Sequence, residues 1–131
     1  MSGAPDPVVL LVEDNELNLE LAEYLLADGG FRVILARDGP QARAAAGRER
    51  PDIVLMDVNL PGVDGLELAR ELRSRPGWES VPVVAVTALA MRGDRERILE
   101  AGLSGYISKP LDVSTFADSV WAFLDRQRGN R

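Results

Sequence analysis

The sequence contains no cysteine and no histidine. Without cysteine, the chain has no disulfide, no thiolate metal site and no thiol nucleophile. Without histidine, it has no Ser-His-Asp triad and no His-ligated zinc, and it cannot carry a phosphohistidine. Chemistry at neutral pH therefore has to come from Asp, Glu, Lys, Tyr, Ser or Thr, or from a bound metal ion.

Long apolar runs and positive charge are also scarce. No run approaches the roughly eighteen apolar residues of a membrane span, and residues 1–7 lack the basic segment that opens a secretory signal. The net charge is −6, which disfavours nonspecific binding to nucleic acid or to anionic membranes. We therefore expect a cytoplasmic protein that binds no nucleic acid and does not insert into a membrane.

Lysine is nearly absent. Of the 15 basic residues, only Lys109 is a lysine and the others are arginines. A general bias toward arginine accounts for the arginines. Lysine carries a compact point charge on a flexible stem, which arginine does not replace where such a charge is needed. Lys109 is therefore a candidate functional residue, although one lysine by itself is a weak signal.

The 131 residues suit one compact domain, and we expect a single domain over residues 1–131 with a core of about 8–126. Short apolar runs alternate with longer amphipathic stretches. The continuous apolar run Val8–Val12 is typical of a strand buried on both faces of a parallel sheet. The pattern predicts five strands, over residues 8–12, 31–36, 52–57, 81–86 and 105–108.

A helical pattern follows each predicted strand. The first helix begins after the N-cap Asn15 and ends at Gly29-Gly30, with Leu17, Leu21, Tyr24 and Leu25 at helical spacing. The remaining helices are predicted over 39–48, around 66–72, over 89–101, and after a cap at Asp112 or Ser114 with fraying beyond about Arg126.

Five strand-helix units predict an α/β fold: a flavodoxin-like, doubly wound, five-stranded parallel sheet with five helices. The expected strand order is 2-1-3-4-5, which follows from the fold class rather than from the residue pattern. The first strand is not followed by G-x-G-x-x-G or by a P-loop, so a dinucleotide or P-loop nucleotide site is disfavoured.

Reactive side chains stand where the predicted strands end. Glu13-Asp14, Asp57, Thr87 and Lys109 follow or close four of the five strands, and ligands of such sheets bind at the carboxyl ends of the strands. Each residue alone has an ordinary explanation, as a helix or turn cap, a strand-end residue or a surface charge. Together they predict one acidic pocket with one lysine.

Gathered carboxylates need a cation or raised pKa values. Two carboxylates about 5 Å apart repel by on the order of 3 kcal/mol at an effective dielectric constant near 20. Mg²⁺ prefers oxygen ligands and keeps several waters. Mg²⁺, a carboxylate, a hydroxyl and a lysine together suit phosphoryl transfer. Asp57, which stands alone at the end of the central strand, is the candidate nucleophile.

The sequence resembles the receiver domains of two-component response regulators, and the resemblance covers about Val8 to Leu124. Two stretches, Val12 to Leu19 and Val83 to Pro110, look most like stand-alone cell-cycle regulators and the receivers of hybrid histidine kinases. The matching segments are Leu11–Asn15, Leu55–Asp57, Leu60–Gly62, Asp64-Gly65, Val86–Ala88 and Ser108–Pro110.

The resemblance implies a role for each site residue. Asp57 accepts a phosphoryl group from a partner's phosphohistidine. Mg²⁺, for which Mn²⁺ can substitute, is held by Asp14, Asp57, the backbone carbonyl of Asn59 and, through water, Glu13. Many members have Asp in place of Glu13, which puts only this water-mediated role in question. Thr87 and Lys109 contact phosphoryl oxygens.

The resemblance also implies a switch and two partner surfaces. Thr87 and Tyr106 move together on phosphorylation, small Ala88 leaves room for the phosphoryl group, and the Lys109-Pro110 bond is cis. A histidine kinase or histidine phosphotransfer protein docks beside Leu17 to Leu21. A downstream protein binds the face of the fourth helix, fifth strand and last helix, where the apolar residues are Ala90, Met91 and Tyr106. The unphosphorylated protein is expected to be a monomer.

Other functions remain open from the residues alone. The chain could be a docking module that is not phosphorylated. A Mg²⁺-dependent phosphatase is disfavoured because Asn59 occupies the position where such enzymes carry a general acid. A flavin site is disfavoured because no phosphate-cradling loop follows the first strand. We therefore expect no enzyme activity beyond phosphoryl transfer to Asp57 and hydrolysis from it. The sequence leaves the partners, the pathway and the phosphate lifetime unassigned.

Overall fold

The computed structural model describes residues 5–60, 62, 64–88 and 92–129. It contains one parallel sheet of five strands in the order β2-β1-β3-β4-β5, which confirms the predicted fold. The strands are β1 (Val8–Val12), β2 (Arg32–Ala36), β3 (Ile53–Asp57), β4 (Val83–Thr87) and β5 (Gly105–Ser108). The helices are α1 (Glu16–Asp28), α2 (Gly39–Arg48), α3 (Gly65–Arg73), α4 (Arg92–Glu100) and α5 (Phe116–Gly129).

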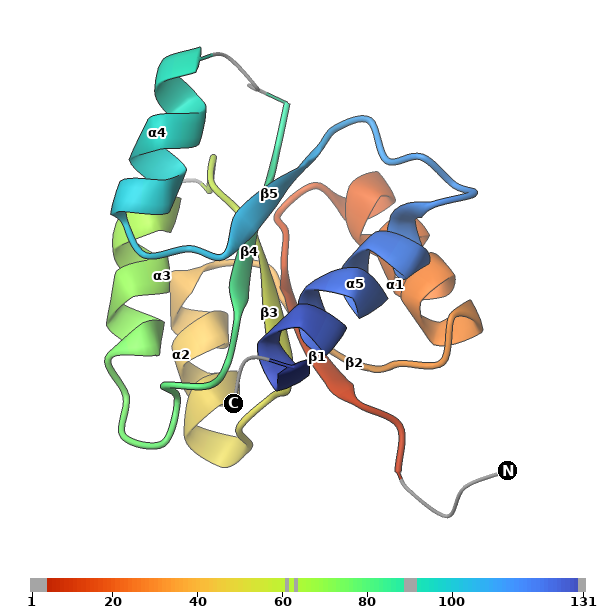
Figure 1. Cartoon of the computed structure of the whole chain (residues 1–131), viewed down its shortest axis with the longest axis horizontal. Helices are drawn as coiled ribbons and strands as arrows, with labels where there is room; N and C mark the ends of the chain where they lie inside the picture. Colours follow the sequence, from red (N-terminus) through yellow and green to blue (C-terminus); the bar gives the residue numbers. More distant parts are fainter. Residues whose placement is uncertain (1–4, 61, 63, 89–91, 130–131) are drawn as a thin grey trace.

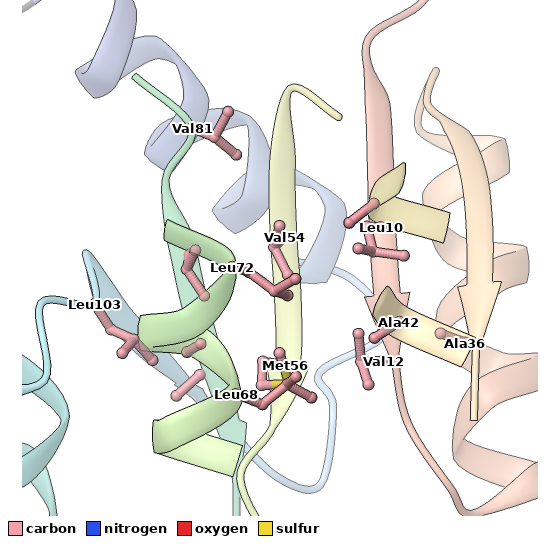
Figure 2. Close-up of a cluster of buried hydrophobic side chains, with 14 of the residues drawn as sticks. Leu10, Val12, Ala36, Ala42, Val54, Met56, Leu68, Leu72, Val81 and Leu103 are labelled. Atoms are coloured by element: carbon pink, nitrogen blue, oxygen red, sulfur yellow. The ribbon is translucent and has the colours of Figure 1, made fainter. Parts of the chain in front are cut away.

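Helices cover both faces of the sheet (Figure 1), so the three inner strands β1, β3 and β4 are buried along their whole length. Successive side chains of a strand point to opposite faces. Leu10 and Met56 therefore pack with residues of α2, α3 and α4, and Figure 2 shows this cluster around α3. Val9 and Leu55 pack on the other face, against α1 and α5.

The strand register brings the carboxyl ends of the inner strands to one edge. Val12 pairs with Met56, and Asp57 pairs with Val86. The residues that follow these pairs, Glu13 after β1 and Thr87 at the end of β4, therefore stand next to Asp57 in the sheet. This edge is the one at which the sequence predicts the functional site.

The first helix begins and ends as predicted, but of its four predicted apolar positions only Leu25 is buried. The side chain of Asn15 accepts a hydrogen bond from the Asn18 N–H at 3.0 Å, and Gly29 caps the other end. However, Leu17, Leu21 and Tyr24 are 78%, 38% and 67% exposed. The core side of the helix is formed by Leu19, Ala22, Leu25 and Leu26.

Three strands begin one or two residues later than predicted. Phe31 precedes β2 and packs its ring against Trp121, with a centroid separation of 4.6 Å. Asp52 precedes β3 and uses its carboxylate to accept a hydrogen bond from the Val8 N–H at 2.7 Å. The fourth strand was predicted over 81–86 and spans Val83–Thr87, which includes Thr87 within the sheet.

The helix α2 spans its predicted range, whereas α5 differs from the prediction at both ends. The Asp112 carboxylate accepts bonds from the Ser114 N–H and O–H, which forms a turn, and α5 begins only at Phe116. This helix continues to Gly129, so the expected fraying is wrong for residues 127–129, and residues 130 and 131 lie outside the described residues. The fourth helix is described over 92–100, and the predicted positions 89–91 lie outside the described residues. Within the described part of the chain, no helix has the length and apolar character needed to span a bilayer.

Candidate functional site

The sequence-predicted acids meet at the carboxyl edge of the sheet. Glu13 and Asp14 follow β1, and Asp57 is the last residue of β3. One carboxylate oxygen from each of the three lies within 4.8 Å of the others. Residues from two separate strand ends thus contribute oxygen ligands to one small volume.

Backbone groups orient the two buried carboxylates. The Asn15 N–H donates to Glu13 Oε2 at 3.1 Å, and the Asn59 N–H donates to Asp57 Oδ1 at 2.9 Å. In both cases the N–H donor lies two residues after the acid. This bond closes a local turn that acidic side chains favour at strand ends. One oxygen of each carboxylate is fixed by the turn, and the other is left for the pocket.

Lys109 lies between those second oxygens. Its Nζ is 2.9 Å from Glu13 Oε1 and 3.3 Å from Asp57 Oδ2. The Lys109 N–H donates to the Thr87 carbonyl at 2.8 Å, which ties the lysine to the end of β4. The lysine that stands out by composition is therefore the cation of this pocket.

Burial and charge act against each other here. Glu13 and Asp57 are both 4% exposed. Burial raises the pKa of Glu13, and the hydrogen bonds from Lys109 and Asn15 offset part of that rise. Burial lowers the pKa of Lys109, but the bond to Glu13 and the charges of Asp57 and Glu13 outweigh it, so the pKa is raised overall. Lys109 is thus cationic at neutral pH.

The donor set fits a small divalent cation. With all three carboxylates ionised, Lys109 neutralises only one of three negative charges. The remaining donors are oxygens, and Asp14 is exposed to solvent, so a bound ion could keep water ligands. Oxygen donors, residual negative charge and access to water are the conditions under which proteins bind Mg²⁺.

Thr87 and Tyr106 occupy neighbouring strands beside the pocket. Thr87 is 1% exposed and pairs with Ser108 of β5. Tyr106 lies two residues before Ser108 and is half-buried. The Lys109-Pro110 bond is cis, as the resemblance implied. Asn59 and Ala88 are exposed, whereas Leu89, Ala90 and Met91 lie outside the described residues.

Gly65 belongs to the site although the sequence predicted no role for it. A Cβ at this position would lie 2.6 Å from the Val58 Cα and 2.9 Å from the Asp57 carbonyl oxygen. The first turn of α3 therefore sits against the loop that positions Asp57. Asp64 begins this turn by accepting a hydrogen bond from the Leu66 N–H at 2.9 Å. A glycine directly after an N-cap, rather than beyond a helix end, is the signal that could have indicated this contact.

Replacing Gly65 with alanine is expected to lower the free energy of unfolding by about 1–3 kcal/mol, because backbone atoms have to move to admit the methyl group. Urea unfolding measures this change. The matched control is Gly47→Ala on α2, where the new Cβ would approach no atom outside its own helix closer than 4.0 Å. That variant is expected to gain about 0.5–1 kcal/mol. Equal stability of the two variants would contradict the packing argument.

The sequence profile of the response regulator receiver domain matches residues 9–120. The chain belongs to this family. The receiver domain is 44% identical over 116 residues to the polar-differentiation response regulator DivK of Brucella anthropi, covering 88% of this chain and 94% of that protein.

Solved receiver structures share the fold. The receiver domain of sensor histidine kinase PA1611 from Pseudomonas aeruginosa is 40% identical, with a TM-score of 0.80 over 97% of this chain and 100% of that one. That structure has a magnesium ion coordinated in its active site cleft. A putative response regulator from Chloroflexus aurantiacus is 29% identical, with a TM-score of 0.86 over 94% of this chain and 100% of that one.

Membership of the family establishes the general function. The chain is a phosphoacceptor switch of two-component signalling, and the alternative of a docking module without phosphorylation is not favoured. Receiver domains bind Mg²⁺ at an acidic pocket and interact with kinases and downstream targets. The acidic pocket of this chain is the cluster of Glu13, Asp14 and Asp57.

Proposed function

We propose that Asp57 is the phosphoacceptor and that it receives its phosphoryl group from a phosphohistidine of a partner protein. The observation that carries this proposal is the position of Asp57. Its carboxylate is buried at the end of the central strand, oriented by the Asn59 N–H and faced by Lys109. Of the three clustered acids, Asp57 alone ends the central strand between Glu13-Asp14 and Thr87.

The proposed reaction is a displacement at phosphorus. A carboxylate oxygen of Asp57 forms a bond to phosphorus while the bond from phosphorus to the donor imidazole nitrogen breaks. The electron pair of the broken bond stays on that nitrogen, and Asp57 becomes an acyl phosphate. Water later attacks this acyl phosphate, which releases inorganic phosphate and restores the carboxylate.

The neighbouring residues stabilise the charge that gathers on the phosphoryl oxygens. Lys109 already lies 3.3 Å from Asp57 Oδ2 and would pair with one oxygen. Thr87 stands at the end of the adjacent strand, where its hydroxyl would donate to another. Glu13, Asp14, Asp57 and the Asn59 carbonyl would hold Mg²⁺, which supplies positive charge beside the transferring group. Mn²⁺ is expected to substitute.

Switching follows from the same contacts. A phosphoryl group adds strong acceptor oxygens and negative charge, so Thr87 would be drawn toward Asp57 and Tyr106 would turn into the vacated space. The affected surface is formed by α4, β5 and α5, which is where a downstream protein would bind. Tyr106 lies on this surface, while Ala90 and Met91 are outside the described residues.

The phosphoryl donor is proposed to dock on α1 beside the pocket. Leu17 and Leu21 lie on the exposed side of the helix, and Tyr24 extends the same stripe one turn further. An exposed apolar stripe beside a reactive edge is typical of a protein contact. The donor would be a histidine kinase or a histidine phosphotransfer protein. A cytoplasmic location and a monomeric unphosphorylated form remain expectations.

The proposal is tested by chemical phosphorylation. The chain is incubated with acetyl phosphate and Mg²⁺, and intact-protein mass spectrometry is expected to show one added phosphoryl group that EDTA prevents. Borohydride reduction followed by peptide sequencing should locate it at Asp57. Modification at another residue would overturn the assignment of Asp57, and no modification at all would leave a docking module as the better assignment. Repeated turnover of small phosphomonoesters would instead indicate a phosphatase.

A further inference from the structure

One arginine of α4 holds the ring of Tyr106 by two contacts. Arg95 Nη2 donates a hydrogen bond to the Tyr106 hydroxyl at 2.9 Å. The Cζ of the same guanidinium lies 5.6 Å from the centroid of the Tyr106 ring, within the range of a cation–π contact. The helix that carries Arg95 lies beside β5 (Figure 1), which carries Tyr106.

Both contacts depend on the orientation of the ring. Arg95 is exposed at the surface of α4, so it reaches the half-buried Tyr106 only while the hydroxyl of the ring lies beside this helix. Turning the ring toward Thr87 would remove the hydroxyl from the guanidinium and end the contact with the ring face. The two contacts therefore stabilise one state of the ring over the other, which is the condition for a group to shift a conformational equilibrium.

We propose that Arg95 is a positioning residue that holds Tyr106 in its resting orientation and so sets how readily the phosphorylated state forms. This inference rests on the proposed function, in which Tyr106 turns inward on phosphorylation. Because coupling between sites is reciprocal, weakening the hold on Tyr106 strengthens ligand binding at Asp57. An exposed hydrogen bond with a cation–π contact corresponds to an effect of about two- to fivefold.

The contact is separate from the attachment of α4 to the rest of the fold. Arg73 of α3 donates a hydrogen bond to the carbonyl of Gly102, two residues after the end of α4, and Ile98 of α4 is buried in the core. The hydrogen bond to Tyr106 also raises the pKa of Arg95, so the guanidinium remains charged. Removing the Arg95 side chain should therefore release the ring while α4 stays in place.

The experiment uses the two tyrosines of the chain as reporters. Protein labelled with 3-fluorotyrosine should give two ¹⁹F signals, one from Tyr106 and one from Tyr24, which lies on α1 at the other face of the sheet and serves as the reference. Beryllofluoride with Mg²⁺ is the probe, since it mimics a phosphoryl group on a carboxylate. The wild type is compared with Arg95→Ala, Arg95→Lys and Arg126→Ala.

In the wild type, beryllofluoride is expected to move the Tyr106 signal. In Arg95→Ala, that signal should start part-way toward the bound position, and beryllofluoride should bind about two- to fivefold more tightly. Arg95→Lys keeps a cation near the ring. Its Tyr106 signal and its beryllofluoride affinity should therefore lie between those of the wild type and those of Arg95→Ala. Arg126 lies 4.9 Å from the ring centroid of Phe123, so Arg126→Ala removes a similar contact without touching Tyr106 and should behave as the wild type.

The outcomes separate this inference from the function on which it rests. If beryllofluoride leaves the Tyr106 signal of the wild type unchanged, both the positioning role of Arg95 and the proposed inward turn of Tyr106 are overturned. A wild type that responds, with an Arg95→Ala variant of unchanged signal and affinity, would overturn the positioning role alone. The positioning role would likewise be overturned if Arg126→Ala tightened binding as much as Arg95→Ala.

Discussion

Replacing Asp57 with asparagine is expected to abolish phosphorylation by acetyl phosphate and by a phosphohistidine donor, without loss of the fold. The amide of asparagine is not a nucleophile, so no acyl phosphate can form. Its carbonyl oxygen can still accept the hydrogen bond that the Asn59 N–H gives to Asp57 Oδ1. Intact-protein mass and thermal unfolding, measured on the same sample, test both parts of this expectation.

The fold of the Asp57→Asn variant should be at least as stable as that of the wild type when Mg²⁺ is absent. The substitution removes one of three clustered negative charges, and like charges held close together destabilise the folded state. Asp64→Asn is the matched control, because Asp64 lies near the site as the N-cap of α3 and asparagine caps a helix equally well. Phosphorylation of Asp57→Asn at the wild-type rate would refute the assignment.

Replacing Lys109 with methionine is expected to change phosphorylation and Mg²⁺ affinity in opposite directions. Loss of the ammonium removes a group that would stabilise the transferring phosphoryl oxygens, and losing one such group slows reactions about 10²–10³-fold. The same loss removes a cation that lies 2.9 Å from Glu13 and 3.3 Å from Asp57. Mg²⁺ would then meet less repulsion and bind more tightly. Calorimetric titration and the phosphorylation rate give the two quantities.

Stability adds a third readout for this variant. Glu13 and Asp57 would stay buried with no cation between them, which should lower the free energy of unfolding by about 1–3 kcal/mol. Saturating Mg²⁺ should restore much of that loss, because a ligand that binds only the folded state stabilises it by about 2.7 kcal/mol at a hundred times its Kd. Weaker Mg²⁺ binding in Lys109→Met would mean that Lys109 organises the acids rather than competing for them.

The sheet and the position of the site were predictable because both depend on short segments. A strand buried on both faces has to be apolar throughout. Continuous apolar runs such as Val8–Val12 and Ile53–Met56 therefore indicate where the buried strands lie in the sequence. Parallel strands end at a common edge, and the residues after those runs were therefore expected to meet. The structure places one carboxylate oxygen each of Glu13, Asp14 and Asp57 within 4.8 Å of one another, as this common edge and the strand order of the fold class led us to expect.

Features that depend on how elements pack were not predictable. Leu17, Leu21 and Tyr24 have helical spacing, but so do Leu19, Ala22 and Leu26, and only packing on β1 and α5 decides which stripe is buried. The clash that excludes a side chain at Gly65 comes from the loop after β3. The contact of Arg95 with Tyr106 likewise depends on the distance between α4 and β5.

The lone lysine has a practical consequence. Apart from the terminal amine, Lys109 carries the only primary amine of the chain, and 18% of its side chain is accessible. For an acylating reagent that modifies lysines, this pocket is therefore the one internal target, and the reaction there is slow at neutral pH because the raised pKa keeps Lys109 cationic. The yield of a single modified peptide would then measure the fraction of molecules in which the pocket is occupied by Mg²⁺ or by a phosphoryl group.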